Sequence, residues 1–569
     1  MKEKIKKILL EKRNIIDIIL IFIIVSIISI PLLNNRLNVY YDDGIQHISR
    51  AYGTYESIKN GNFKIIESLS NGFGYSWNLF YGPLTSYGII IINLFINNFI
   101  ISYKIFVYIL LILSGIFMYK FMYQMTANRN ISLLAAGIYV LAPYHLTDLY
   151  VRNALGEFAS FVFIPLVFWG LYNLFNNENK NFYLTVGAVG LILTHNISTA
   201  ITAIFAIIYV LTNIIKFKNK RIIKDFFINI LFIILITSFF WMPLLETKLS
   251  AEYAAYQDGF MATPESVQEK GLNVKNLFVT FTNEEFVFEI GPCLILLAFS
   301  LVAIRNLERL KKEYILFLIF SVLSLFMATK YFPWKYLPSI LSMIQFPWRM
   351  LEFSTFFLSV VCSINAFVII KRFNFKDVLI MILVLIMYII ALNSFIQIGQ
   401  EEIIPIEEIK KQGYFSGKQD EIVIGAAKGE YLTVNANNDK FYLATREDSV
   451  YVISGKAVIE KEEKNRNGMR FKVKNVEETE YELPYIYYPG YEIRMDGIII
   501  ENHETKNGFL GFKLEDKTEA TIEVKYVGTK LMKFSYIISL IGIVGFTISM
   551  IKDRKIEKSE RKEEKCQNQ

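Results

Sequence analysis

The stretch IILIFIIVSIISIPLL, residues 18–33, decides the class of fold. It carries no charged side chain and follows the basic start Met1-Lys-Glu-Lys-Ile-Lys-Lys. Secretory signal peptides begin in the same way, but this run is long and lacks a small-x-small cleavage site. We therefore expect it to remain in the chain as the first membrane span.

Similar apolar runs recur along the chain as far as residue 398. A helix needs ~20 mostly apolar residues to cross the hydrocarbon layer, and many of these runs have about that length. The 569 residues are 53% hydrophobic, whereas soluble domains contain roughly 45–50% apolar residues. The sequence thus predicts an α-helical polytopic membrane protein with about 12 spans.

The net charge of +7 arises largely from Lys and Arg clusters in the short loops between apolar runs. This distribution is the positive-inside pattern and does not indicate a nucleic-acid partner. It predicts a multi-pass membrane protein with both termini in the cytoplasm.

Counting crossings between the basic clusters divides the chain. The predicted parts are a cytoplasmic basic tail at 1–14, a transmembrane domain at 15–398 with a large first outer loop at 34–101, an extracytoplasmic β-domain at 399–530, a last span at 531–551 and a charged cytoplasmic tail at 552–569. The apolar run Leu84–Ile100 in the outer loop is interrupted by asparagines. We expect this run to be re-entrant or to lie along the outer surface.

The region 399–530 differs in composition from the rest of the chain. Alternating polar and apolar residues indicate half-buried strands separated by Gly and Asn turns. The alternating stretches are 431–434, 449–453, 470–474 and 521–526. The length suits a β-sandwich, and no cysteine in the region could form a disulfide framework.

The first outer loop carries the most informative chemistry, Tyr40-Tyr-Asp-Asp-Gly-Ile-Gln-His-Ile-Ser-Arg50. If a helix starts at Gly44, then Asp43, His47 and Arg50 lie on one helix face. Such a face could bind a phosphate and deprotonate a hydroxyl. Asp43-x-x-Gln46 also has the spacing of a capping box. A structural role for Asp43 as the cap of the helix is therefore an open alternative.

Further polar residues at the outer face would suit a lipid-phosphate pocket, because a guanidinium donates two hydrogen bonds to a phosphate. These residues are Arg152, Glu157, His195, Asn196 and Arg349. Each also has a structural alternative: an internal ion pair between Arg152 and Glu157, a helix-hairpin turn at 195–196, and an interface anchor beside Trp348 for Arg349. The aromatic run 485–491 could stack on sugar rings or form the core of a strand.

An acidic pair just after the first span, leading into a helix that ends near Lys59, resembles the GT-C glycosyltransferase class. More closely, the chain resembles the bacterial membrane family labelled 6-pyruvoyl-tetrahydropterin synthase-related, a neighbour of the YfhO-like proteins. The matching residues are Asp43, His47, Arg50, Gly61, Phe63, Asn71-Gly-x-Gly-Tyr75, Phe80-Tyr-x-Pro83, Ala142-Pro-Tyr144, Tyr150–Glu157, Thr194-His-Asn196, Gln345–Met350 and Tyr488–Gly497.

This resemblance implies a membrane glycosyltransferase that moves a sugar from a polyprenyl-phosphate donor to an envelope glycan or lipid acceptor at the outer face. Asp42 matches the leading acid of the GT-C pair, and Asp43 matches the acid of the nearer family. Either acid would act as general base on the acceptor hydroxyl, or would hold a divalent cation where the enzyme uses one. The membrane lipid and the donor phosphate would be bound by His47, Arg50, Arg152, Glu157, His195, Asn196 and Arg349.

The sequence indicates no other cofactor. The four histidines show no close ligand spacing, so we expect no pterin chemistry despite the label of the family. No phosphate-binding loop, nucleophile elbow or His-Glu-x-x-His motif is present, so a nucleotide is not expected. Two other functions stay open: a carrier or flippase for a lipid-linked intermediate, and a non-catalytic envelope binding protein.

Overall fold

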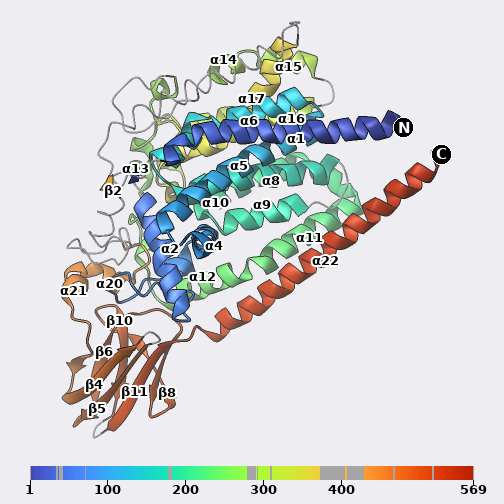
Figure 1. The fold of residues 1–569 in the computed structure, drawn as a ribbon. Helices are drawn as coiled ribbons and strands as arrows, with labels where there is room; N and C mark the ends of the chain where they lie inside the picture. The colour runs from blue at the N-terminus through green and yellow to red at the C-terminus, as the bar shows by residue number, and fades with distance from the viewer. Residues whose placement is uncertain are drawn as a thin grey trace.

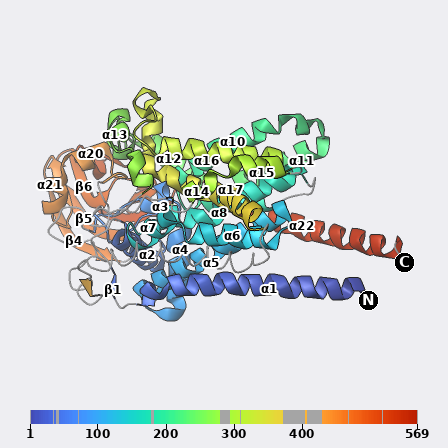
Figure 2. The same cartoon turned by 90° about the horizontal axis from the view of Figure 1, so that it is seen from above.

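The computed structural model describes residues 2–33, 36–37, 43–70, 72–176, 182–278, 290, 293–307, 310–371, 404–405, 429–465, 468–515 and 518–567. Asp42 and residues 372–398, the last part of the predicted transmembrane domain, lie outside these described residues. The helices form an elongated body, with the C-terminal strands gathered at one end (Figure 1). The first helix α1, Lys2–Ile28, and the last helix α22, Lys530–Gln567, extend to the opposite end (Figures 1 and 2).

Two helices form the centre of the helical body, α8 (Leu155–Asn176) and α17 (Met350–Ile370). Nearly every residue of both helices is buried, as expected for helices that are apolar on all sides. Other helices pack around this centre: α5 (Phe99–Thr126), α6 (Arg129–Val140), α9 (Phe182–Ile192), α10 (Asn196–Thr212) and α16 (Lys311–Met327).

Four of the described helices are long and apolar enough to cross a membrane: Phe99–Thr126, Leu155–Asn176, Pro347–Ile370 and Lys530–Asp553. A fifth candidate consists of α11 (Lys220–Ile236) and α12 (Ser238–Ser250), which meet at an angle of 64°. The described helices thus support a polytopic helical protein, but they do not establish the predicted number of twelve spans.

The run after Pro83 forms the short helix α4, Leu84–Ile96, which ends at Asn97 in the left-handed conformation. Its 13 residues extend about 20 Å at 1.5 Å per residue, less than the ~30 Å hydrocarbon layer. Asn98 then caps the start of α5 with its side chain. The helix is therefore shorter than a full span, and a re-entrant or surface position of this segment stays a prediction.

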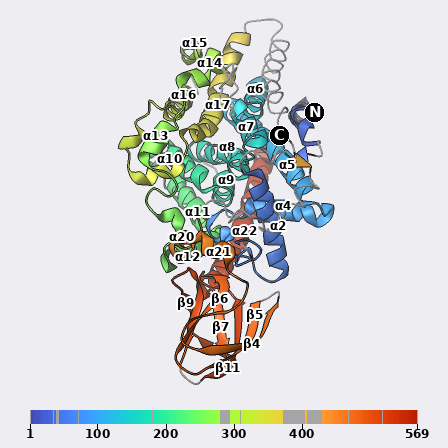
Figure 3. The same cartoon turned by 90° about the vertical axis from the view of Figure 1, so that its left-hand side faces the viewer.

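The C-terminal region contains two antiparallel sheets (Figure 3). Their strand orders are β3-β6-β10-β9 and β4-β5-β11-β7-β8. The strands are β3 (Tyr451–Ser454), β4 (Ala457–Asn465), β5 (Gly468–Asn475), β6 (Thr479–Ile486), β7 (Tyr491–Met495), β8 (Ile498–Ile500), β9 (His503–Glu504), β10 (Phe509–Leu514) and β11 (Glu519–Tyr526). A separate short pair joins β1 (Arg36–Leu37) to β2 (Ile404–Pro405).

Alternation along the chain predicted three of these strands, β3, β5 and β11. In β5, Met469, Phe471 and Val473 are buried, whereas the basic residues between them are exposed. The expected strand at 431–434 is wrong, because Thr433 caps a helix there and accepts a hydrogen bond from the Ala436 amide. That helix, α20 (Val434–Asn438), is followed by α21 (Lys440–Thr445).

Residues 60–82, which we call the connecting loop, lie between the sheets and the helices. The loop and the sheets share one apolar core, and the Ile486 amide of β6 donates to the Phe73 carbonyl at 2.9 Å. Farther along, the ammonium group of buried Lys64 donates to the Phe239 carbonyl at 3.0 Å, close to the break between α11 and α12. The loop therefore contacts both the β-strands and the helical body.

The remaining short helices connect these parts. They are α2 (Gly44–Lys59), α3 (Trp77–Phe80), α7 (Pro143–Tyr150), α13 (Pro264–Glu269), α14 (Cys293–Leu297) and α15 (Ser300–Asn306).

Candidate active site

The start of α2 lies against the turn between α7 and α8. The helix begins at Gly44, so Asp43, His47 and Arg50 share one face, as the spacing predicts. The Asp43 amide donates to the Arg152 carbonyl at 3.0 Å, and a Cβ on Gly44 would lie only 2.9 Å from Asn153 Cβ. The Asp43 side chain makes no capping hydrogen bond, so the capping-box alternative does not describe this helix start.

Arg50 is completely buried. Its guanidinium donates to Asn78 Oδ1 at 3.1 and 3.2 Å and to the carbonyls of Tyr81 at 2.9 Å and Gly82 at 3.1 Å. One terminal nitrogen has no acceptor, and no carboxylate pairs with Arg50 within the part of the chain that the structure describes. Burial lowers the Arg50 pKa to about 10, so the group is still cationic at neutral pH.

Tyr81 connects the two halves of the site. Its ring centroid lies 6.1 Å from that of His47 and 6.1 Å from that of His195, and the Arg50 guanidinium is 4.8 Å from the ring. The hydroxyl of Tyr81 lies so close to Gly156 that a Cβ at that position would overlap it. Only glycine at position 156 therefore allows this approach to the first turn of α8.

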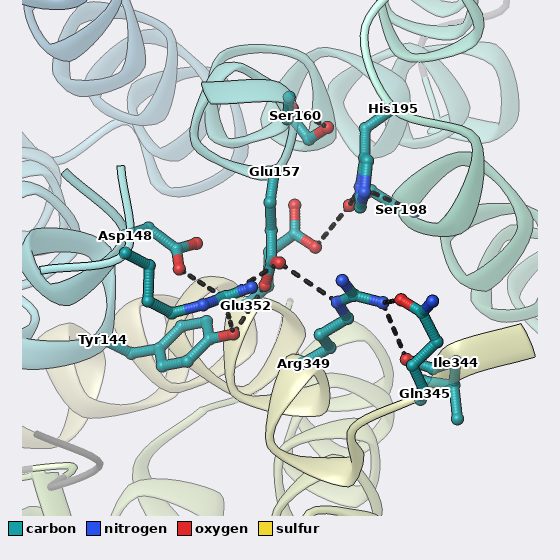
Figure 4. Close-up of polar contacts among 12 residues, drawn as sticks. Tyr144, Asp148, Glu157, Ser160, His195, Ser198, Ile344, Gln345, Arg349 and Glu352 are labelled. Atoms are coloured by element: carbon teal, nitrogen blue, oxygen red, sulfur yellow. Dashed lines mark hydrogen bonds and ion pairs between the residues drawn. The ribbon is translucent and has the colours of Figure 1, made fainter. Parts of the chain in front are cut away.

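Glu157 lies at the centre of a buried ionic network (Figure 4). Its carboxylate accepts hydrogen bonds from the Tyr144 hydroxyl at 2.5 Å and from Arg152 at 3.0 Å, and Arg349 Nε lies 3.4 Å away. Arg152 also donates to Asp148 at 2.6 Å. One buried carboxylate thus pairs with guanidinium groups from two distant segments of the chain.

Arg349 is oriented by the segment just before it. It donates to the Ile344 carbonyl at 2.8 Å and to Gln345 Oε1 at 2.6 Å (Figure 4). The backbone φ of Gln345 is +63°, a value that side-chain-bearing residues rarely adopt. Such strain persists where surrounding contacts enforce it, and it is common at functional sites.

His195 and Asn196 lie at the start of α10. The His195 imidazole contacts the Ser198 hydroxyl, and that hydroxyl is hydrogen-bonded to Glu352 of α17 at 2.6 Å. The Asn196 side chain donates to the Phe80 carbonyl at 2.8 Å. Asn196 therefore holds the connecting loop against the helices, in addition to belonging to the expected turn.

The structure brings the predicted residues into one region, although they come from distant parts of the chain. Sequence reasoning did not select several residues that complete the network. They are Tyr81, Tyr144, Asp148, Ser198, Gln345 and Glu352. Tyr81, Tyr144 and Gln345 lie inside the motifs that carried the family resemblance, which was the available signal, whereas Asp148, Ser198 and Glu352 lie outside those motifs.

The described residues contain no group of three His, Cys, Asp or Glu side chains that could hold a metal ion. Asp42, the other member of the acidic pair, lies outside them. The described donor groups therefore do not define a divalent-cation site.

His47 should make the folded protein sensitive to acid. Burial, together with nearby Arg50 and His195, lowers the His47 pKa from 6.5 to about 3. The unfolded chain therefore binds a proton first, and stability should fall as the pH drops below about 6.5 and level off near 3. We expect His47 to contribute about 2 kcal/mol of destabilisation at ~pH 5.

This effect can be measured by thermal unfolding in detergent at several pH values. The His47→Gln variant should lack the part of the pH dependence that His47 causes. Subtracting the stability of the variant from that of the wild-type protein at each pH removes the contribution of the other histidines. A parallel pH dependence in both proteins would show that His47 is not the titrating group.

A mostly helical body with apolar helices long enough to span a membrane, two C-terminal antiparallel sheets and a buried site rich in arginine define the class of this protein. The chain belongs to the 6-pyruvoyl-tetrahydropterin synthase-related family, whose domain, described as a membrane protein, matches residues 79–399. This confirms the family indicated by the sequence motifs.

The chain is also similar to a protein of Lactococcus lactis subsp. cremoris (strain MG1363) described as uncharacterized. The two are 28% identical over 346 residues, which cover 57% of this chain and 55% of the relative. The matched part thus spans about half the length of that relative.

Proposed function

We propose that the protein is a membrane glycosyltransferase that moves a sugar from a polyprenyl-phosphate donor to an envelope glycan or lipid acceptor. In this proposal the chain crosses the membrane twelve times, with both termini in the cytoplasm. The two sheets form a β-sandwich on the outer side, and the site lies at the outer face.

The unmatched charge of Arg50 carries the proposal. A buried cation without an anionic partner is costly, and a buried donor without an acceptor adds to that cost. Arg50 has a vacant hydrogen-bonding nitrogen and no carboxylate partner among the described residues. A phosphate would supply both a charge and acceptor oxygens, which the planar guanidinium group binds well.

Asp43 supplies the base in this proposal. It lies two helical turns from Arg50 on the same face of α2 and is partly exposed. Its carboxylate would take the proton from the acceptor hydroxyl as that oxygen bonds to the anomeric carbon. The bond from that carbon to the phosphate oxygen breaks, and the polyprenyl phosphate leaves beside Arg50.

The Asp43→Asn variant should transfer sugar at least about 100-fold more slowly, the lower end of the effect of general base catalysis. Its fold should persist, because the Asp43 side chain caps no helix amide. Transfer from radiolabelled polyprenyl-phosphate sugars would be measured in membranes with equal amounts of each protein, and Asp42→Asn would be assayed in parallel.

Glu56→Gln offers a matched control on the same helix. Glu56 is exposed and pairs with Lys59 at 2.9 Å, away from the site. The Glu56→Gln variant should transfer sugar at the wild-type rate. The proposed function would be contradicted if both aspartate variants transferred sugar at the wild-type rate. It would also be contradicted if membranes with the wild-type protein transferred no more sugar than empty membranes with any donor.

A further inference from the structure

Three buried residues form a hydrogen-bonded chain that ends in the site. Glu352 on α17 contacts Ser198 on α10, with 2.6 Å between Oε2 and Oγ, and Ser198 Oγ lies 2.7 Å from His195 Nδ1 (Figure 4). Glu352 is 1% exposed and Ser198 is 1% exposed, whereas His195 keeps 6%. Only His195 is therefore exposed enough to pass a proton out of this series of hydrogen bonds.

A backbone hydrogen bond sets the position of the protons. The Ser198 amide donates to His195 Nδ1 at 3.3 Å, which makes His195 the side-chain cap of α10. A backbone N–H can only donate, so Nδ1 must be the unprotonated nitrogen of the neutral ring. The ring proton is then on Nε2, and the Ser198 hydroxyl donates its hydrogen to Nδ1.

The same count determines the state of Glu352. A hydroxyl carries one hydrogen, and that of Ser198 is already donated to His195. The short contact between Ser198 and Glu352 therefore requires a hydrogen from the carboxyl group. With this tautomer Glu352 is a neutral acid that donates from Oε2, whereas an ionised Glu352 would accept from Ser198 and go with a protonated Nδ1.

The partners of Glu352 support its neutral state. Among the described residues, no Lys, Arg or His forms an ion pair with Glu352, whereas Glu157 pairs with both Arg152 and Arg349. The Glu352 Oε1 atom is buried and accepts no hydrogen bond, which costs less for the carbonyl oxygen of an acid than for a carboxylate.

We infer that Glu352, Ser198 and His195 form a proton relay that delivers a proton from His195 Nε2 to an anionic oxygen of the substrate. As the Nε2–H bond breaks, the Ser198 hydroxyl proton passes to Nδ1, and the Glu352 proton passes to Ser198 Oγ. The imidazole stays neutral throughout, and Glu352 ends as a carboxylate one helical turn from Arg349. After the product leaves, a hydronium ion from solvent protonates Nε2, the Nδ1 proton returns to Ser198 Oγ, and the Ser198 proton returns to Glu352, which restores the starting state.

The relay rests on the proposed function in one respect, the identity of the oxygen that receives the proton. In that function the oxygen belongs to the donor phosphate. His195 touches the substrate, and is therefore the catalytic residue, whereas Ser198 and Glu352 are positioning residues that act through it.

Spectroscopy of the full chain in lipid nanodiscs tests the proton arrangement without any assay of activity. With ¹⁵N-labelled histidine, only four residues contribute signals, and the His195→Gln variant identifies that of His195. We expect a protonated Nε2 and an unprotonated Nδ1. Infrared spectra should contain a carboxylic acid band that disappears in Glu352→Gln and persists in Ser160→Ala.

Ser160 is a suitable control because it is a buried serine that donates only to the Gly156 carbonyl of its own helix. A protonated Nδ1, or the absence of a Glu352 acid band, would overturn the inference. Either result would mean that Glu352 is a carboxylate and that the chain of hydrogen bonds runs in the opposite direction.

Kinetics test the transfer of the proton. The Glu352→Gln side chain can still donate to Ser198 and keep the imidazole in place, but it cannot release a proton. We expect its kcat to fall about 100-fold with little change in KM, while Ser160→Ala keeps the wild-type kcat. An unchanged kcat in Glu352→Gln would exclude the relay. If even the wild-type protein transfers no sugar, the proposed function fails, whereas the spectra still decide the proton arrangement.

Discussion

Replacing Arg446 by methionine is expected to lower the free energy of unfolding by about 3–5 kcal/mol. The side chains of Arg446 and Glu482 are both completely buried and pair at 3.1 Å. Glu482 also accepts hydrogen bonds from Tyr442, Thr505 and Asn507, so it cannot move toward water when its cation is removed. The variant would leave a buried, uncompensated carboxylate.

The cost should spread beyond the sheets. The Arg446 guanidinium lies 5.5 Å from the ring of Phe73 in the connecting loop and 4.7 Å from that of Phe509 in β10. The loss would be measured by denaturant titration in detergent micelles. Arg494→Met is the control, because the pair of Arg494 with Glu492 is partly exposed and should contribute less than about 1 kcal/mol. Similar losses in the two variants would contradict this account.

Glu157→Gln should be equally damaging, with an expected loss of about 3–5 kcal/mol and of any activity of the site. The change keeps the shape of the side chain but removes the anion that Arg152 and Arg349 share. Asp148 would remain to balance Arg152, and Arg349 would keep only neutral acceptors among its described contacts. Denaturant titration and thermal unfolding of the ligand-free protein would both measure the loss of stability.

Glu352→Gln provides the matched comparison. Both glutamates are buried on the two central helices, and both receive the same substitution. If Glu352 is a neutral acid, its replacement by the neutral amide should cost less than about 1.5 kcal/mol, because one hydrogen-bond donor replaces another. Equal destabilisation of the two variants would indicate that Glu352 is charged as well.

Local patterns predicted those parts of the fold that depend on local physics. Alternation predicted β5 and β11, and the spacing of Asp43, His47 and Arg50 predicted one face of α2. The asparagines that interrupt the apolar run coincide with the end of α4 at Asn97 and with the cap of α5 at Asn98.

Contacts between distant segments could not be predicted in this way. The pairing of Glu157 with Arg349 and the chain from His195 to Glu352 depend on how α8, α10 and α17 pack. The apolar residues of the connecting loop show no period that distinguishes a place in the β-core from a place at the membrane surface. Residue 431 begins an alternating stretch, but a capping threonine two residues later favours a helix.

The shared core of the connecting loop and the sheets has a consequence for the ancestry of this protein. Phe73 and Ile486 are neighbours in space but lie at opposite ends of the sequence, and Asn78, just beyond Phe73, holds the Arg50 side chain. The sheets are therefore not an independent module, because the connecting loop supplies part of their apolar core. Recombination at either boundary of the strands would separate two halves of one hydrophobic interior, so residues 60–82 and the strands should be inherited as a unit.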